Sequence, residues 1–224
     1  ASMITGQFTG DTFFTEQYNS DIQSQIVAEN PSFLINPFVD DMIKRNTDND
    51  VVFQQVINHV NLNRVYVLTT GNTASASELV INGLKPYIDV IQIGGTTVGK
   101  YQASITLYDS DNFRRANANP NHTYAIQPLI FKSLNANGVT DYDSGLVPNI
   151  AFGERFNNLG ILGDINEPYL AAALMNIEET GRFMLPQATD LKELSGSSSL
   201  QPLYNEMYTD KKLPDFLIEK FKLQ

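Results

Sequence analysis

A serine and a lysine in the middle of the chain have types and spacing that can support hydrolysis. Ser75 follows a strand-like run at residues 65–70 and opens an amphipathic helix pattern. Lys100 follows the next apolar strand, residues 89–93, and a glycine-rich turn. A serine hydroxyl becomes a good nucleophile when a base removes its proton, and a neutral lysine can be that base. The pair therefore indicates a serine hydrolase in which the two side chains meet.

The surroundings of both residues suit this chemistry. Burial among apolar groups disfavours the charged form of a lysine, and no Asp or Glu lies within eight residues of Lys100 in the sequence. The first N–H groups of a helix have no partner within the helix, and such groups can bind a developing oxyanion. The backbone N–H of Ala76, beside Ser75, is therefore the candidate oxyanion donor.

The block Ser-Ala-Ser-Glu at residues 75–78, followed by a helix, a strand and a Gly-Lys pair, resembles the carboxyl-terminal processing (tail-specific) protease family. In that family the first serine of the block is the nucleophile, and the lysine 25 residues later is the general base. The resemblance therefore implies these roles for Ser75 and Lys100. Residues 145–149 and 162–174 are similar to later family segments, so the resemblance covers residues 64–178. It implies an α/β fold with a crotonase/ClpP-like core and an acyl-enzyme mechanism.

The position that orients the lysine departs from the family pattern. Many members carry an Asp 11 residues after the serine, where this chain has Pro86, or a Gln four residues after the lysine, where it has Ser104. Proline cannot orient an amine. Gln102 and Ser104 are therefore the candidates for the lysine-orienting residue.

Two family features, the upstream glycine-rich oxyanion strand and the PDZ-like module, are absent from the chain. We expect residues 1–178 to be the C-terminal portion of a protease catalytic domain, and residues 179–224 to be a polar linker with a short helical tail. The leading hypothesis is a Ser-Lys serine endopeptidase that cleaves proteins near their C-terminal ends. The alternative is a non-catalytic peptide-binding homologue, or a fragment inactive alone because the upstream oxyanion segment is missing.

Simpler interpretations exist for both residues. Ser75 and Glu78 match a capping box, and most such serines only cap a helix. Residues 94–100 match most of a phosphate-binding P-loop, which requires a Ser or Thr next and then a helix. Tyr101 stands there instead, and the residues that follow are strand-like. The sequence therefore argues against nucleotide binding.

Other cofactor chemistry has little support in the composition. The chain has no cysteine and two histidines, without an HExxH pattern, so we expect no metal and no cofactor. His59 is predicted on a helix face, and His122 lies in a turn-rich loop.

The expected partners follow from charge and resemblance. A formal net charge of −10 argues against nucleic acid and anionic membrane surfaces, and the apolar stretches are too short to span a membrane. The expected partners are a polypeptide substrate, bound as an extended strand, and the upstream segment of the same protease. By resemblance alone, the whole protein is expected in the bacterial cell envelope or periplasm, with a lipid anchor.

The elements that must position the pair alternate between strands and helices, which is typical of an α/β domain. Periodicity and boundary residues predict helices and strands along the whole chain. The predicted helices are residues 1–5, 20–29, 37–45, 51–60, 75–85, 166–178 and 213–222. The predicted strands are residues 12–18, 64–70 (as a buried strand), 89–94, 102–109 and 123–132.

Overall fold

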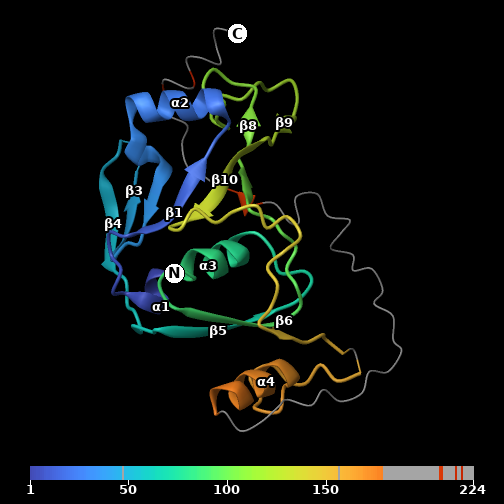
Figure 1. Cartoon of the computed structure of the whole chain (residues 1–224). Coiled ribbons are helices and arrows are strands. Elements are labelled where there is room, and N and C mark those ends of the chain that lie inside the picture. Colours follow the sequence, from blue (N-terminus) through green and yellow to red (C-terminus); the bar gives the residue numbers. More distant parts are fainter. Residues whose placement is uncertain (47, 156, 179–206, 209–214, 216–217, 219–224) are drawn as a thin grey trace.

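The computed structural model of the chain describes all residues except 47, 156, 179–206, 209–214, 216–217 and 219–224. Its elements stack in four layers, which are a five-stranded sheet, helix α3, a three-stranded sheet and helix α4 (Figure 1). Helix α3 (Ala76–Leu84) packs against strands of both sheets, whereas α4 (Pro168–Ile177) packs against strands β5 and β6 of the smaller sheet. The helix that begins next to Ser75 is therefore enclosed between two sheets.

The three-stranded sheet positions both candidate residues. Its strands are β5 (Arg64–Thr69), β6 (Asp89–Gly94) and β11 (Ile150–Ala151), in the order β11-β6-β5, and all pairs are parallel. Parallel neighbours need a crossover, and α3 is the crossover between β5 and β6. The turns that follow β5 and β6 therefore begin at the same end of the sheet. The turn after β5 carries Ser75, and the turn after β6 carries Lys100.

The larger sheet lies on the other side of α3. Its order is β12-β7-β10-β1-β2, with antiparallel pairs except the parallel pair of β12 and β7. Its strands are β1 (Thr12–Gln17), β2 (Ile35–Pro37), β7 (Gln102–Ser104), β10 (Leu129–Asn135) and β12 (Met207–Tyr208). The remaining short elements are α1 (Ser2–Thr5), α2 (Ser20–Glu29), η1 (Pro31–Leu34), β8 (Leu107–Tyr108) and β9 (Ala125–Ile126).

Three apolar clusters fill the spaces between these layers. Buried residues of α3 and β6, among them Ile81, Leu84 and Val90, form the central cluster with Leu146. Burial of each such side chain contributes about 1.5–3 kcal/mol. The other two clusters consist of Tyr18, Ile26, Leu34, Ala103 and Phe131 around α2, and of Ile93, Ala172 and Ala173 under α4. Helix α3 is therefore held by the central core and cannot shift freely.

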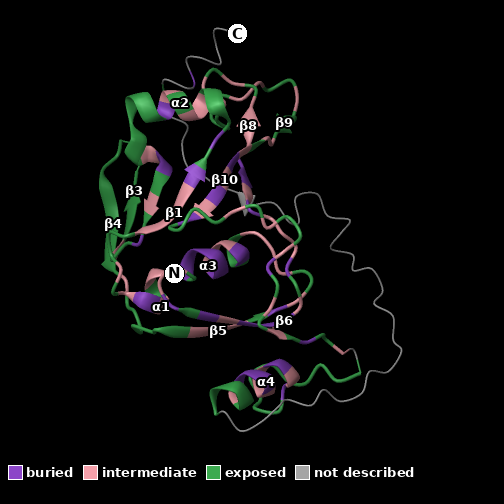
Figure 2. Cartoon of the chain, viewed as in Figure 1, coloured by how far each residue is buried: buried purple, intermediate pink, exposed green. Residues whose placement is uncertain are grey.

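The helices predicted at residues 37–45 and 51–60 are wrong. These segments form the antiparallel strands β3 (Asp41–Arg45) and β4 (Val51–Val56). Valine, isoleucine and phenylalanine favour strands, and Asn46 closes the hairpin by accepting hydrogen bonds from the N–H groups of Asp48 and Asp50 at 3.0 and 2.9 Å. Most of this hairpin is exposed (Figure 2).

Most other predicted elements are confirmed within about two residues, including α1, α2, α3, α4, β1, β5 and β6. The predicted strand 102–109 is divided into β7 and β8, and the predicted strand 123–132 into β9 and β10. Strand β5 is an edge strand and is half-buried or exposed over most of its length, so the prediction of a buried strand is wrong.

The predicted linker and tail, residues 179–224, lie mostly outside the described residues. Within that range Met207–Tyr208 forms β12. In the part of the chain that the structure describes, no helix is long and apolar enough to cross a membrane.

Candidate active site

Ser75 occupies a backbone conformation that is unusual for a serine. It stands between β5 and α3 with φ 62° and ψ −119°. Helix N-cap residues normally have extended dihedrals with negative φ, and a non-glycine residue outside the favoured regions costs about 1–3 kcal/mol. Such strain persists only where the surroundings impose it, and it is concentrated at functional sites. The conformation therefore distinguishes Ser75 from an ordinary helix cap.

The turn that carries Lys100 is packed directly against the turn that carries Ser75. The Val98 N–H donates to the carbonyl oxygen of Thr73 at 2.9 Å. Gly99 has φ 93°, and a Cβ atom there would overlap the carbonyl oxygen of Asp143. Glycine is thus required immediately before Lys100, because this backbone must pass the loop at residues 141–145.

Glu78 links the two candidate residues. Its Oε2 accepts hydrogen bonds from the backbone N–H of Ser75 at 2.9 Å and from that of Lys100 at 2.7 Å. Its Oε1 accepts a third, from the N–H of Gly99 at 2.6 Å, and the residue is 0% exposed. The structure therefore brings the backbones of Ser75 and Lys100 to one oxygen atom. The sequence has no Asp or Glu near Lys100, but the fold brings the carboxylate of Glu78, on α3, to the backbone of Lys100.

The other predicted site residues lie on elements that adjoin this pair. Ala76 is the first residue of α3, so its N–H has no acceptor within the helix. Gln102 begins β7 opposite Lys132 of β10. Ser104 ends β7, is 0% exposed, and its hydroxyl accepts a hydrogen bond from the Gln127 amide at 3.0 Å. An oxyanion role for Ala76 and a lysine-orienting role for Gln102 or Ser104 stay predictions.

Tyr142 is a neighbour of this site that sequence reasoning missed. Burial and, after it, the charge of Glu78 raise the pKa of the Tyr142 hydroxyl. Its ring lies 5.1 Å from that of Tyr101, centroid to centroid. No local sequence pattern could identify Tyr142, because it belongs to a loop that is distant from both motifs along the chain.

The two histidines lie in loops. His59 follows β4 and is beside Gly6 rather than on a helix, so its predicted helical position is wrong. His122 lies in the loop before β9, with its Nε2 3.1 Å from Oδ2 of Asp109. Among the described residues, no group of three or more His, Cys, Asp or Glu side chains could hold a metal ion. The element after Lys100 is β7, so the helix of a P-loop does not follow it.

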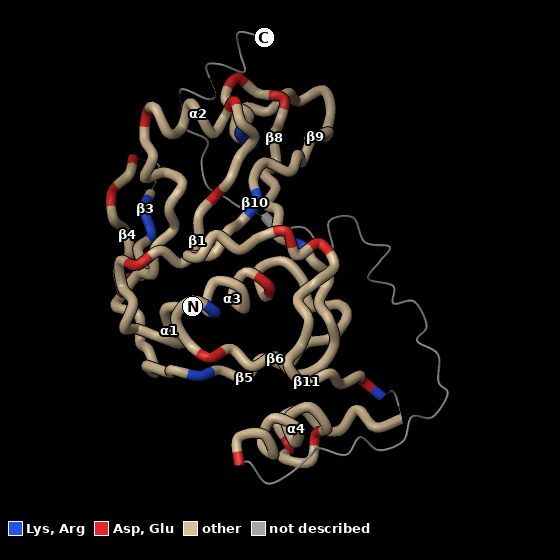
Figure 3. The backbone as a smooth tube through the Cα atoms, in the orientation of Figure 1, with Lys and Arg blue, Asp and Glu red and all other residues tan. Residues whose placement is uncertain are grey.

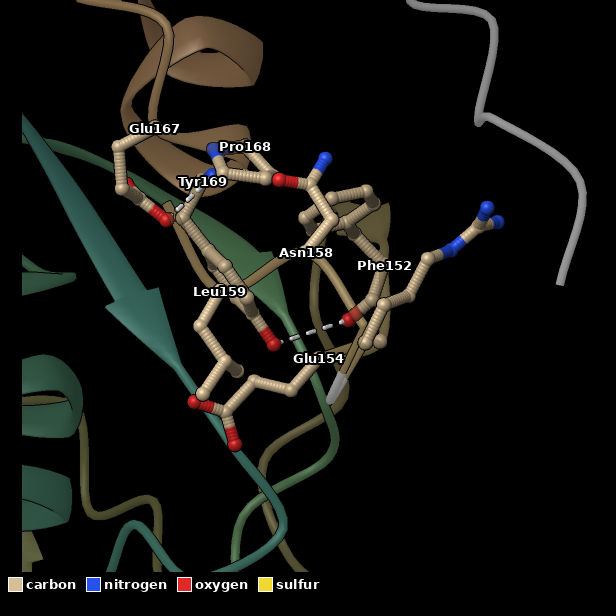
Figure 4. Close-up of a pocket in the computed structure, with 9 residues that line it drawn as sticks. Phe152, Glu154, Asn158, Leu159, Glu167, Pro168 and Tyr169 are labelled. Atoms are coloured by element: carbon tan, nitrogen blue, oxygen red, sulfur yellow. Dashed lines mark hydrogen bonds between the residues drawn. The ribbon is translucent and has the colours of Figure 1, made fainter. Parts of the chain in front are cut away.

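A separate pocket lies beside the start of α4 (Figure 4). Its volume is about 20 Å³, which is room for about one water molecule. Glu167 accepts hydrogen bonds there from the N–H groups of Tyr169 and Leu170, at 3.0 and 2.7 Å. Burial, followed by the charge of Glu154, raises the pKa of Tyr169 to about 12. Neither Ser75 nor Lys100 lines this pocket. The carboxylate of Glu167 caps the start of α4.

Comparisons with known proteins identify the fold. No protein-family profile and no curated protein matches the sequence. The chain is similar to the crystal structure of a “Putative S41 protease” from Bacteroides fragilis, with a TM-score of 0.55 and 23% sequence identity over 81% of this chain. The photosystem II D1 C-terminal processing protease gives a TM-score of 0.33 and 18% identity over 51% of this chain and 27% of that protein, which is too low to argue from.

The first comparison shows that the chain has the mixed α/β fold of that protein over 81% of its length. The matched region spans 40% of the Bacteroides fragilis protein. The fold expected from the Ser-Ala-Ser-Glu and Gly-Lys resemblance is thus found, at the level of its α/β class.

Proposed function

We propose that the chain is the C-terminal part of the catalytic domain of a serine endopeptidase of the carboxyl-terminal processing type, with Ser75 as nucleophile and Lys100 as general base. The observation that carries this proposal is the strained turn at Ser75, joined through Glu78 to the turn of Lys100. The sequence resemblance and the fold shared with an S41 protease support it. On the same grounds we propose a crotonase/ClpP-like core built around β5, α3 and β6, with residues 179–224 as an appended tail.

The reaction follows from the chemistry of the pair. The neutral amine of Lys100 takes the proton of the Ser75 hydroxyl as its oxygen attacks the scissile carbonyl carbon. The negative charge of the tetrahedral intermediate develops beside the N–H of Ala76. When the C–N bond breaks, Lys100 returns the proton to the leaving amine and an ester with Ser75 remains. Water, deprotonated by Lys100, then attacks the ester carbonyl carbon. The C–O bond to Ser75 breaks, Lys100 returns the proton to the Ser75 oxygen, and the product leaves with a new carboxyl group.

The substrate in this proposal is a polypeptide near its C-terminal end, with its backbone paired to a sheet edge as an extra strand. The upstream segment of the same protease completes the oxyanion site. In the described part of the chain, Lys and Arg are dispersed over several elements (Figure 3), which with the net charge of −10 disfavours nucleic acid as a partner. By family resemblance we propose the bacterial cell envelope, with a lipid anchor, as the location.

Substitution of Ser75 tests the proposal. In the full-length protein, Ser75→Ala is expected to lower peptide hydrolysis at least ~1000-fold, while the free energy of unfolding falls by only about 1 kcal/mol. Ser77→Ala, an exposed serine in the same block, is the matched control and should keep its activity. Turnover retained by Ser75→Ala contradicts the nucleophile assignment. A full-length protein that binds peptides and hydrolyses none favours a non-catalytic homologue.

A further inference from the structure

Glu78 makes more hydrogen bonds than a helix cap requires. In a capping box the carboxylate at the third helical position accepts one bond, from the N–H of the N-cap residue. Glu78 makes that bond to Ser75 and two more to Gly99 and Lys100 on a different turn. The two additional bonds contribute nothing to the start of α3. They fix the Lys100 turn relative to α3.

The burial of this carboxylate makes its hydrogen bonds hard to replace. Burying a carboxylate is costly unless hydrogen bonds compensate it, and Glu78 is 0% exposed with three backbone N–H donors around it. A displacement of the Lys100 turn would take two of these donors away from the buried oxygens. Glu78 therefore opposes any separation of the two turns.

We propose that Glu78 is a positioning residue, which holds the turns of Ser75 and Lys100 together through its three hydrogen bonds. The meaning of this for catalysis rests on the proposed function, in which Lys100 accepts the proton of Ser75. The hydrogen bonds themselves concern the backbone alone and are independent of any activity.

The variant Glu78→Gln removes the charge and leaves one side-chain oxygen in place of two. At least one of the three N–H groups then faces an amide NH₂ group. Glu167→Gln is the matched control, because Glu167 is another buried carboxylate (8% exposed) that accepts two backbone N–H bonds at a helix start, away from Lys100. A merely structural role predicts the same behaviour for both variants.

The decisive measurement is an NMR comparison of backbone amide signals on isotope-labelled protein. The amide signals of Ser75, Gly99 and Lys100 should move in Glu78→Gln, and at least one of these amides should exchange its hydrogen faster because its acceptor is lost. Glu167→Gln should leave all three amide signals in place.

Glu78→Asp serves if the Gln variant does not fold. It keeps the carboxylate on a side chain one methylene shorter, so the oxygens no longer reach all three N–H groups and we expect the three amide signals to move. Unmoved amide signals in both Glu78 variants overturn the positioning role.

Kinetics on the full-length protein complete the test. We expect Glu78→Gln to lower kcat at least ~10-fold with KM within about threefold, and Glu167→Gln to leave both within about threefold. The amide measurement requires no substrate, so it decides the inference even if the full-length protein hydrolyses no peptide, an outcome that would count against the proposed function alone.

Discussion

The helices on the two faces of the three-stranded sheet, α3 and α4, each have a buried glutamate at their start, but the two glutamates accept hydrogen bonds from different parts of the chain. At α4, Glu167 is the N-cap itself, with φ −62° and ψ 128°, and it accepts hydrogen bonds from Tyr169 and Leu170 in the first turn of its own helix. At α3 the N-cap is Ser75, with φ 62° and ψ −119°, and Glu78 bonds to both Ser75 and the Lys100 turn.

The same chemical group thus stabilises one helix at α4 and joins two segments at α3. The first arrangement is what helix formation alone requires. The second adds backbone strain and long-range hydrogen bonds that helix formation does not require. We infer that the α3 start has a function that the α4 start does not share. Substitutions at each helix start can test this difference.

The largest effect is expected from Lys100→Arg. Guanidinium stays protonated and cannot accept the serine proton, so peptide hydrolysis by the full-length protein should fall at least ~1000-fold. The measurement is kcat/KM across pH 6–10, a range that lies below the ordinary lysine pKa of about 10.4. Lys44→Arg, on the exposed strand β3, is the control. Activity within about tenfold of the unmodified protein would return Lys100 to the class of ordinary turn lysines.

Glu167→Ala tests the start of α4. Two hydrogen bonds to the α4 start are lost, so the free energy of unfolding should fall by about 1–2 kcal/mol in urea titrations. The folded protein should keep the kcat of the full-length enzyme. A large loss of kcat without unfolding would show that the two helix starts are not functionally different.

A smaller effect is expected from Ser75→Gly. Glycine adopts positive φ at little cost, so relief of strain should offset the lost hydroxyl, and the free energy of unfolding should stay level or rise by about 1 kcal/mol. Ser75→Ala, which keeps the strain, is the comparison variant. If Ser75 were an ordinary cap, glycine would lower the stability below that of the serine protein.

The smallest effect concerns Tyr142. Its pKa is raised in the folded protein by burial and by the charge of Glu78, so the unfolded chain releases this proton first as the pH rises. The stability that the neutral hydroxyl contributes is therefore complete below the ordinary value of about 10 and is lost above it. Tyr142→Phe should flatten the fall of the unfolding midpoint above about pH 10. Tyr169, whose pKa is raised chiefly by burial, should still contribute to the fall of the unfolding midpoint in the Tyr142→Phe variant.

The sequence was sufficient to predict the elements that carry the candidate site. Helix α3 has a capping box, apolar residues at helical spacing and a proline just past its end, and it lies between two apolar runs. Each of these signals is local, and each was found where it was expected.

The hairpin of β3 and β4 was missed because helical spacing occurs in it by coincidence. Val52, Val56 and Val60 stand four residues apart, as on one face of a helix, yet the structure places Val52 and Val56 on an exposed strand. The hydrogen bonds of the Asn46 side chain decide the turn. A periodic pattern predicts a helix reliably only where a core covers its apolar face.

The link from Glu78 to Lys100 had no signal in the sequence. Its donors are backbone N–H groups, which every residue except proline carries, so residue types do not reveal the contact. The same holds for Tyr142, which reaches the site through the packing of its loop against Gly99. The nucleophile and base candidates could be predicted, whereas the groups that hold them together depend on tertiary structure.

Covalent labelling decides whether Lys100 activates Ser75 as a nucleophile. The full-length protein is treated with a fluorophosphonate probe, which forms a stable ester with an activated serine, and the modified peptide is located by mass spectrometry. We expect one adduct, on Ser75, whose formation is at least ~100-fold slower in Lys100→Arg and unchanged in Glu167→Gln. An adduct on another serine, or equal labelling of Ser75 in Lys100→Arg, would contradict a serine nucleophile activated by Lys100.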